Sequence, residues 1–404
     1  MSAADPNAAT SAAPAVESVR AEVGNIPAIE GMRGIAVLWV MVFHYVVVRD
    51  GKFADAFIVA LKDWPVLDAF VRNGYLGVDL FFLITGFLLT LPWFRHADAG
   101  LPHPHWRAFY ARRARRILPA YYVQLVILFF LVVPVLLPKI WMQSTAYVVG
   151  NIGAHATFLH YTNPLTSASM TVNGALWTLA IEMQYYLLLP LVAPLFVKWP
   201  WRSLVAAFLI AAGWRWLAWH DLDWLVKAYV RLAQPARVTD ETIRHFLATQ
   251  LPAYAFHFAL GILLGRMWML RRAKVVEGIA RLLPVAVAAG SVWALLAALR
   301  GGTAILGDLG WATYPVVIAV GFGAVASWPS KWLSRVVANP ALAWVGKVSY
   351  SAYLYHLPVL LLFNHFLPGF GAFIAFGAWV AIVLAISAAS FRYVEKPYLA
   401  RRAV

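Results

Sequence analysis

Long apolar runs dominate this chain of 404 residues. Runs of about 20 residues, the length that a helix needs to cross the hydrocarbon core of a bilayer, recur through most of the sequence. Hydrophobic residues make up 62% of the chain and charged residues only 13%, which is atypical of a soluble globular protein. The sequence therefore predicts an all-α fold, a polytopic helical membrane bundle with about ten transmembrane helices. We place these near 29–48, 74–94, 117–138, 174–197, 203–219, 251–270, 278–299, 311–328, 343–366 and 371–392.

The loops between these runs alternate in charge. Arginine and lysine gather in the loops 95–116, 271–274 and 331–335 and in the C-terminal tail, whereas 49–73 and 220–250 mix both signs. Basic loops stay in the cytoplasm, so the pattern predicts that both termini are cytoplasmic.

The chain divides into a tail and one membrane domain. Residues 1–24 are rich in alanine and serine and predict a disordered N-terminal tail, and 25–404 form a single transmembrane domain. Residues 139–173 fit no span and predict a re-entrant or interfacial segment.

Composition excludes several functions. The net charge of +15 comes from basic residues in short loops, which is a topological signal, and we expect no nucleic-acid binding. The chain has no cysteine, which excludes disulfides, thiol catalysis and thiolate metal sites. We expect no bound metal.

Titratable residues inside the predicted spans suggest a shared polar site. A rise of ~1.5 Å per residue places His44, Glu182 and His356 at roughly 18–21 Å above the cytoplasmic face. Three separate, satisfied core groups are the alternative. A charge inside a span is costly and is usually kept for function, facing the bundle interior.

The first apolar run, "EGMRGIAVLWVMVFHY", carries Arg33 and His44 eleven residues apart. At ~100° per residue they share one helix face, roughly 16 Å apart along the axis. Arg33 can alternatively snorkel to the membrane surface, whereas His44 lies too deep to do so.

A second basic stretch precedes the third run. "FYARRARRILPAYY" contains Arg112, Arg113, Arg115 and Arg116. Topology and contact with anionic lipid explain such a cluster, and so does a phosphate clamp, because guanidinium forks bind phosphate bidentately.

Several segments, in order along nearly the whole chain, resemble the membrane-bound acyltransferase-3 family of bacterial O-acyltransferases. Thr85 stands where the family usually has Ser, and Glu30 where it has Asp. The matching segments are "EGMRGIAVLWVMVFHY", "GVDLFFLITGFLLT", "FYARRARRILP", "LWTLAIEMQYYLLLP", "VGKVSYSAYLYHLP" and "YVEKP".

The resemblance implies an enzyme that transfers an acyl group, in the first instance acetyl, from cytoplasmic acyl-CoA to a hydroxyl of a carbohydrate, glycolipid or other cell-envelope or secondary-metabolite acceptor. Acyl-CoA is then a co-substrate, with no permanently bound cofactor. Many relatives carry a further esterase-like domain, so this chain is expected either to complete transfer alone or to hand the group to a separate partner outside the membrane.

Given the acyl-CoA donor that the resemblance implies, the residues themselves suggest roles. Arg33, Arg113 and Arg116 would hold the CoA phosphates by charge-assisted hydrogen bonds. His44 would act as general base, with Glu182 orienting it. An acyl-histidine intermediate is an equal route, and Arg33 joins His44 and Glu182 as a catalytic candidate.

The substrate-binding candidates are Trp177, Tyr186, Tyr353, His356 and Asp79, the last with a structural role as its alternative. The principal rival function is a transporter or flippase of a glycan or lipid intermediate. Such proteins show repeated halves with paired broken helices, and no such repeat is found in this sequence.

Overall fold

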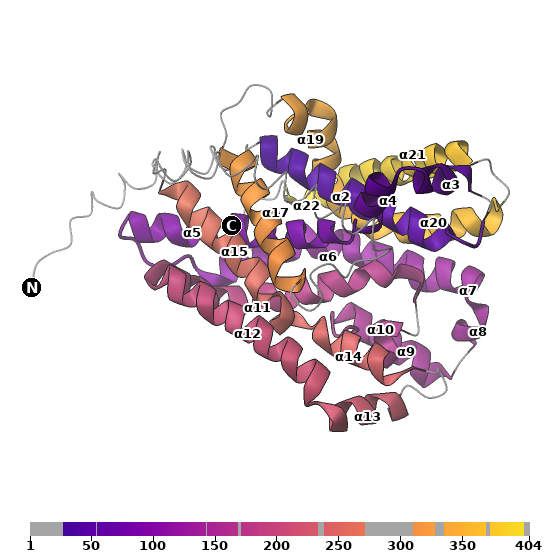
Figure 1. Cartoon of the computed structure of the whole chain (residues 1–404), viewed down its shortest axis with the longest axis horizontal. Helices are drawn as coiled ribbons and strands as arrows, with labels where there is room; N and C mark the ends of the chain where they lie inside the picture. The colour runs from indigo at the N-terminus through magenta and orange to yellow at the C-terminus, as the bar shows by residue number, and fades with distance from the viewer. Residues whose placement is uncertain are drawn as a thin grey trace, which may run out of the picture.

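The computed structural model of the chain is helical throughout its described residues, and no strand occurs among them (Figure 1). This confirms the all-α prediction. The structure describes residues 27–53, 55–142, 144–168, 171–232, 238–270, 310–327, 335–368 and 372–399.

The N-terminal half begins with helix α2. Its helices are α2 (Pro27–Arg49), α3 (Ala56–Lys62), α4 (Pro65–Arg72), α5 (Leu76–Asp98), α6 (Trp106–Ile127), η1 (Leu128–Val132), α7 (Val133–Leu136), α8 (Pro138–Trp141), α9 (Thr145–Ala156), α10 (Pro164–Ala168), η2 (Thr171–Leu176) and α11 (Trp177–Lys198).

The C-terminal half completes the bundle and includes a π-helical turn. Its helices are α12 (Pro200–His220), α13 (Asp223–Leu232), α14 (Asp240–Ala248), η3 (Leu251–Tyr254), α15 (Ala255–Met269), α17 (Gly310–Ser327), α19 (Pro340–Lys347), α20 (Ser349–Phe366), α21 (Ala372–Ser390), η5 (Phe391–Glu395) and α22 (Lys396–Leu399).

Several of these helices are long and apolar enough to cross a bilayer. Five helical stretches qualify within the described chain, and a sixth is the pair α14 with η3–α15, bent by 52°. The number of ten spans and the cytoplasmic termini stay predictions. The qualifying single stretches are Ala28–Arg49, Leu76–Asp98, Trp106–Leu136, Asn173–Lys198 and Phe373–Leu399.

The other predicted spans have mixed outcomes. Helices α12, α17 and α20 lie where spans were predicted, although they do not pass the same test of length and apolarity. The predicted tail 1–24 and the predicted span 278–299 lie outside the described residues. Segment 139–173 forms the short helices α8, α9 and α10 and the start of η2.

Close helix contacts in the bundle depend on glycine. At the crossing of α5 and α15, a Cβ on Gly86 would lie 2.3 Å from the carbonyl oxygen of Phe258. A Cβ on Gly261 would lie 2.1 Å from the carbonyl oxygen of Leu83. Small residues let membrane helices approach to backbone contact, where dispersion forces stabilise the pair. This contact holds α5 in the centre of the bundle.

Helix α5 is staggered along α2 by about half the length of α2. Gly77, near the start of α5, lies against Ala36, in the middle of α2, where a Cβ would be 2.6 Å from the carbonyl oxygen. Further along α5, Ile84 packs with Ile29 and Met32 at the start of α2. Figure 1 shows that α5 extends past the N-terminal end of α2, on the side away from α20. The stagger brings the middle of α5 level with Arg33.

Candidate active site

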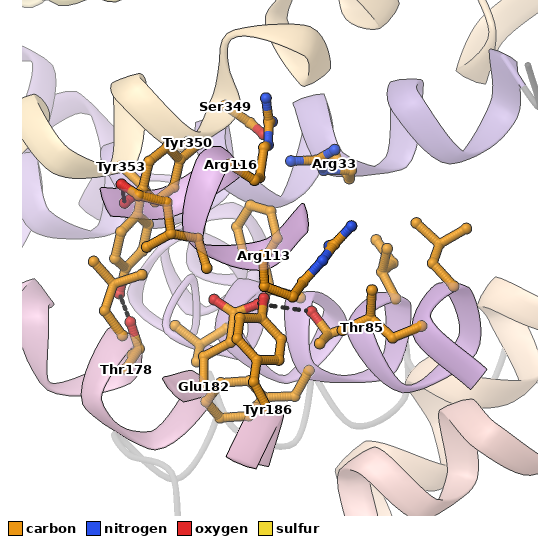
Figure 2. Close-up of a pocket in the computed structure, with 18 residues that line it drawn as sticks. Arg33, Thr85, Arg113, Arg116, Thr178, Glu182, Tyr186, Ser349, Tyr350 and Tyr353 are labelled. Carbon is orange, nitrogen blue, oxygen red and sulfur yellow. Dashed lines mark hydrogen bonds between the residues drawn. The ribbon is translucent and has the colours of Figure 1, made fainter. Parts of the chain in front are cut away.

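A cavity of about 840 Å³, open mouth included, lies between α2, α5, α6, α11 and α20. Its apolar wall comes mainly from α5, including Phe81, Phe82 and Leu88. Figure 2 shows its polar residues, which come from all five helices: Arg33, Thr85, Arg113, Arg116, Thr178, Glu182, Tyr186, Ser349, Tyr350 and Tyr353.

Three arginines gather on one side of this cavity (Figure 2). Arg113 and Arg116 are three residues apart on α6 and therefore share a helix face, opposite Arg33 on α2. All three predicted phosphate-binding residues thus line one cavity.

These arginines are unequally satisfied. Arg33 reaches Glu30 at 3.6 Å, too far for a good hydrogen bond. The Nε atom of Arg113 is buried with no hydrogen-bond partner in the described chain. Arg116 donates from Nη1 to Glu395 at 3.0 Å. The cavity therefore offers buried guanidinium donors with unused capacity, which suits an anionic ligand.

Glu182 faces the arginines from α11. Its Oε1 accepts a hydrogen bond from the hydroxyl of Thr85 at 3.0 Å and another from the hydroxyl of Tyr186. Glu182 and Tyr186 are four residues apart and share a helix face. Thr85 supplies a hydroxyl where the family has Ser, so this substitution keeps the hydrogen-bonding group.

His44 contacts His356 directly. The two atoms are Nδ1 of His44 and Nε2 of His356, 3.2 Å apart, and Nδ1 of His44 also lies 2.9 Å from the carbonyl oxygen of Val40. Nδ1 of His356 lies 2.8 Å from the carbonyl oxygen of Tyr353.

These contacts fix the tautomers of the neutral pair. A carbonyl oxygen only accepts, so His356 carries its proton on Nδ1 and presents the lone pair of Nε2 to His44. His44 then carries its own proton on Nδ1, which leaves the lone pair on its Nε2. In this arrangement Nε2 of His44 is the basic atom of the pair.

Tyr353 connects the histidine pair to the cavity. It lines the cavity, and its ring centroid lies 5.6 Å from that of His356. Its hydroxyl donates to the carbonyl oxygen of Ala175 at 3.0 Å and lies 2.7 Å from the hydroxyl of Thr178. The histidines therefore lie beyond the Tyr353 end of the cavity.

The expected common level of His44, Glu182 and His356 is found only for the two histidines. Glu182 is bonded to Thr85, which lies eight residues after Gly77 and hence ~12 Å further toward the start of α2. The depths expected from the sequence assume that every predicted span begins at the membrane surface. Helix α5 instead is shifted along α2, so equal residue counts from the span ends do not give equal levels. Glu182 accordingly lies with Arg33 in the cavity.

Two other candidates lie outside the cavity lining. Asp79 is 3.5 Å from Nε2 of His257, between α5 and α15. Trp177 packs against Tyr161 and Tyr254, with ring centroids 5.4 and 5.7 Å away.

Sequence reasoning missed two buried carboxylates that hold arginines. Asp55 accepts from Arg49 at 2.7 Å, and Glu395 accepts from Arg116. Glu395 lies in "YVEKP", a motif that carried the family resemblance, which was the available signal. No cluster of three or more His, Asp or Glu in the described part of the chain has the geometry to hold a metal ion.

Comparisons with known proteins place the chain in a family. The acyltransferase domain model (acyltransferase-3) matches residues 26–391. "Regulator of hypoxia-inducible factor 1" of Caenorhabditis elegans is 27% identical over 82% of this chain and 70% of its own length. No solved structure matches.

Bacterial relatives carry more specific names. "Peptidoglycan O-acetyltransferase OatA" of Listeria monocytogenes is 27% identical, and "Putative O-acetyltransferase SACOL0978" of Staphylococcus aureus is 23% identical, both over 92% of this chain. The matches cover 55% and 57% of those two proteins, so the chain spans little more than half their length. With the helical membrane architecture and this match over nearly its whole length, the chain belongs to the acyltransferase-3 family and is an acyltransferase.

Proposed function

We propose that the protein transfers an acyl group from cytoplasmic acyl-CoA to a hydroxyl of a carbohydrate or lipid-linked acceptor in the bacterial inner membrane. The acyl group that we expect is acetyl. One observation carries the proposal: a single cavity has three arginines on one side and ends at Tyr353, next to the His356–His44 pair. The names of the bacterial relatives support acetyl transfer to oxygen.

The arginines bind the donor in this proposal. Arg33, Arg113 and Arg116 hold the CoA phosphates by charge-assisted hydrogen bonds, and the thin acyl-bearing arm extends along α2. Arg33 and His44 are eleven residues apart, or ~16 Å along the helix. The carboxylate of Glu182 lies in the cavity with Arg33 and, in this proposal, accepts hydrogen bonds from amide N–H groups of the arm.

His44 acts as the general base. Its Nε2 takes the proton of the acceptor hydroxyl as that oxygen attacks the thioester carbonyl. When the tetrahedral intermediate collapses, the CoA thiolate leaves and takes the proton from His44. His356 orients His44 and stabilises its protonated form through Nδ1, the role that a carboxylate has in a triad. The alternative route forms an acyl-histidine at the same atom, before the acceptor attacks.

The acceptor approaches from the side of Trp177, Tyr353 and Asp79 in this scheme. Trp177 precedes Thr178, which lines the Tyr353 end of the cavity. A separate protein outside the membrane completes transfer if the acceptor is not itself membrane-bound.

The test is transfer of the acyl group from radiolabelled acetyl-CoA in membrane vesicles, followed by mass spectrometry of envelope glycans and lipids. His44→Ala is expected to abolish transfer with normal folded yield. His365→Ala, an exposed histidine on α20, is the matched control and is expected to retain activity. Wild-type transfer by His44→Ala would refute the general-base role. Movement of a glycan or lipid across vesicles without acyl-CoA would favour the transporter function instead.

A further inference from the structure

Arg116 forms an ion pair with a residue far along the chain, Glu395. Its Nη1 donates to Oε2 of Glu395 at 3.0 Å, across 279 residues of sequence. The side chain of Glu395 is 0% exposed, whereas that of Arg116 is 20% exposed and lines the cavity. Arg116 thus joins a wholly buried carboxylate to the open side of the site.

Glu395 is itself fixed by α20. Its Oε1 accepts a hydrogen bond of 2.6 Å from the hydroxyl of Ser351, which lies 2.7 Å from the hydroxyl of Ser390. Glu395 is the last residue of the π-helical turn η5, which follows α21. A π-helical turn redirects side chains within a helix and is frequent at functional sites. The carboxylate therefore has both oxygens engaged and little freedom to move.

The neighbouring tyrosine also supports Arg116. Tyr350 lines the cavity, its ring centroid lies 6.0 Å from the guanidinium carbon of Arg116, and its hydroxyl donates to the carbonyl oxygen of Ile117 at 2.9 Å. Ring, carboxylate and helix α6 together restrain this guanidinium. Arg113, on the same helix face, forms no ion pair with a carboxylate of the described residues.

We propose that Glu395 is a positioning residue, which orients the Arg116 guanidinium toward the phosphates of the acyl donor. Binding a ligand restricts the rotamers of an arginine side chain, and a guanidinium group that is already held loses less rotamer entropy on binding. Glu395 engages Nη1 and leaves the other donors of the fork for the ligand. This role rests on the proposed function, because it assumes an acyl-CoA donor.

The carboxylate also opposes ligand binding, because its charge offsets that of Arg116. Orientation and charge therefore act in opposite directions, and substitutions separate them. Glu395→Gln keeps an oxygen acceptor for Arg116 and removes the charge. Glu395→Ala removes both. Orientation predicts that Ala weakens donor binding and Gln does not, whereas a purely electrostatic effect predicts that both variants tighten it.

The experiment measures the Kd of acetyl-CoA for the full chain in nanodiscs, with the melting temperature of each variant recorded alongside. Glu395→Ala is expected to raise Kd about tenfold, the size of one charge-assisted hydrogen bond. Glu395→Gln is expected to stay within about threefold of wild type, and Ser351→Ala to fall between the two. Acetyl-pantetheine, which has no phosphate, is expected to bind wild type and Glu395→Ala equally.

A double-mutant cycle completes the test. In an Arg116→Ala background, Glu395→Ala is expected to cause no further loss of acetyl-CoA affinity, because the residue acts through Arg116. Additive losses, or an unchanged Kd in folded Glu395→Ala with only a lower melting temperature, would overturn the positioning role alone. A wild-type protein that binds no acetyl-CoA would instead overturn the donor assignment and the proposed function with it.

Discussion

Helix α2 carries an arginine toward each of its ends, and the two are used differently. Arg49 is almost wholly buried, with a side chain 2% exposed, and it donates to Asp55 at 2.7 Å and to Asn364. Arg33 is 20% exposed, lines the cavity, and has Glu30 at 3.6 Å, itself 40% exposed. The same residue type on one helix is saturated at one end and unsaturated at the other.

The difference lies in how each end of α2 is anchored. Beyond Arg49, the carboxylate of Asp55 also accepts from Tyr45 at 2.8 Å, so polar contacts hold this end to α3 and α20. At the Arg33 end, backbone contact with α19 holds the helix: a Cβ on Gly346 would lie 1.7 Å from the carbonyl oxygen of Glu30. The glycine contact leaves the guanidinium of Arg33 free for a ligand. Saturation of hydrogen bonds thus separates the structural Arg49 from Arg33, which we propose binds the donor.

The largest effect is expected at the saturated end. Asp55→Ala leaves Arg49 buried without its carboxylate, which typically costs about 3–5 kcal/mol. We expect a much lower melting temperature and folded yield in detergent, while the folded fraction keeps its affinity for acetyl-CoA. Normal stability of Asp55→Ala would mean that the Arg49 network is not structural, and it would contradict the distinction drawn between Arg49 and Arg33.

At the unsaturated end the expected loss is one of binding. Under the proposed function, Arg33→Ala removes a hydrogen-bond donor to phosphate worth about 1.5–3 kcal/mol, so the Kd of acetyl-CoA should rise about 10- to 100-fold. The melting temperature should change little, because Arg33 has no close protein partner in the described chain. A large drop in melting temperature with unchanged Kd would assign Arg33 to the structural class.

A third change tests the glycine anchor. Gly346→Ala inserts a methyl group where the backbone of Glu30 lies, and overpacking of this kind costs about 1–3 kcal/mol. We expect a lower melting temperature and also weaker acetyl-CoA binding, since α2 shifts and carries Arg33 with it. Gly377→Ala, where a Cβ meets nothing within 4 Å, is the matched control. Equal melting temperatures for the two variants would contradict the anchor.

The smallest effect is expected in the exposed ion pairs just after α2. The hydrogen bond from Lys62 and the ion pair with Arg72 lower the pKa of Asp50. Lys62→Ala should cost less than about 1 kcal/mol, because exposed pairs are screened by solvent.

The stability difference between wild type and Lys62→Ala depends on pH because the pKa of Asp50 is lowered in the folded state. A carboxylate whose pKa is lowered in the folded state stabilises the protein fully at pH values above its unfolded-state pKa of about 3.9. This contribution is lost as the pH falls through the folded-state pKa. The gap in melting temperature between wild type and Lys62→Ala should therefore be constant near neutral pH and close below about pH 3.9. A gap that widens on acidification would contradict this.

The sequence was sufficient for some features and insufficient for others. Apolar length and motif order predicted the helical class and the family, because both are local properties of the chain. Spacing places Arg113 and Arg116 on one helix face, but it does not place Arg33, on another helix, beside them, although all three line one cavity. The depth of Glu182 was misjudged because the stagger of α5 along α2 depends on Gly77 meeting Ala36, a contact between distant residues. The pairing of Glu395 with Arg116 was missed for the same reason.

The contact between Arg116 and Glu395 also has a consequence for biosynthesis. Glu395 follows every cavity-lining residue in chain order, so the ribosome makes it after all of them. Until η5 has been inserted beside α6, Arg116 lacks the carboxylate that holds it, and the arginine side of the cavity is incomplete. A nascent chain with α2, α5, α6, α11 and α20 already in the bilayer would thus still lack a finished donor site. Under the proposed role of Glu395, the affinity for the donor would reach its full value only after η5 has joined the bundle.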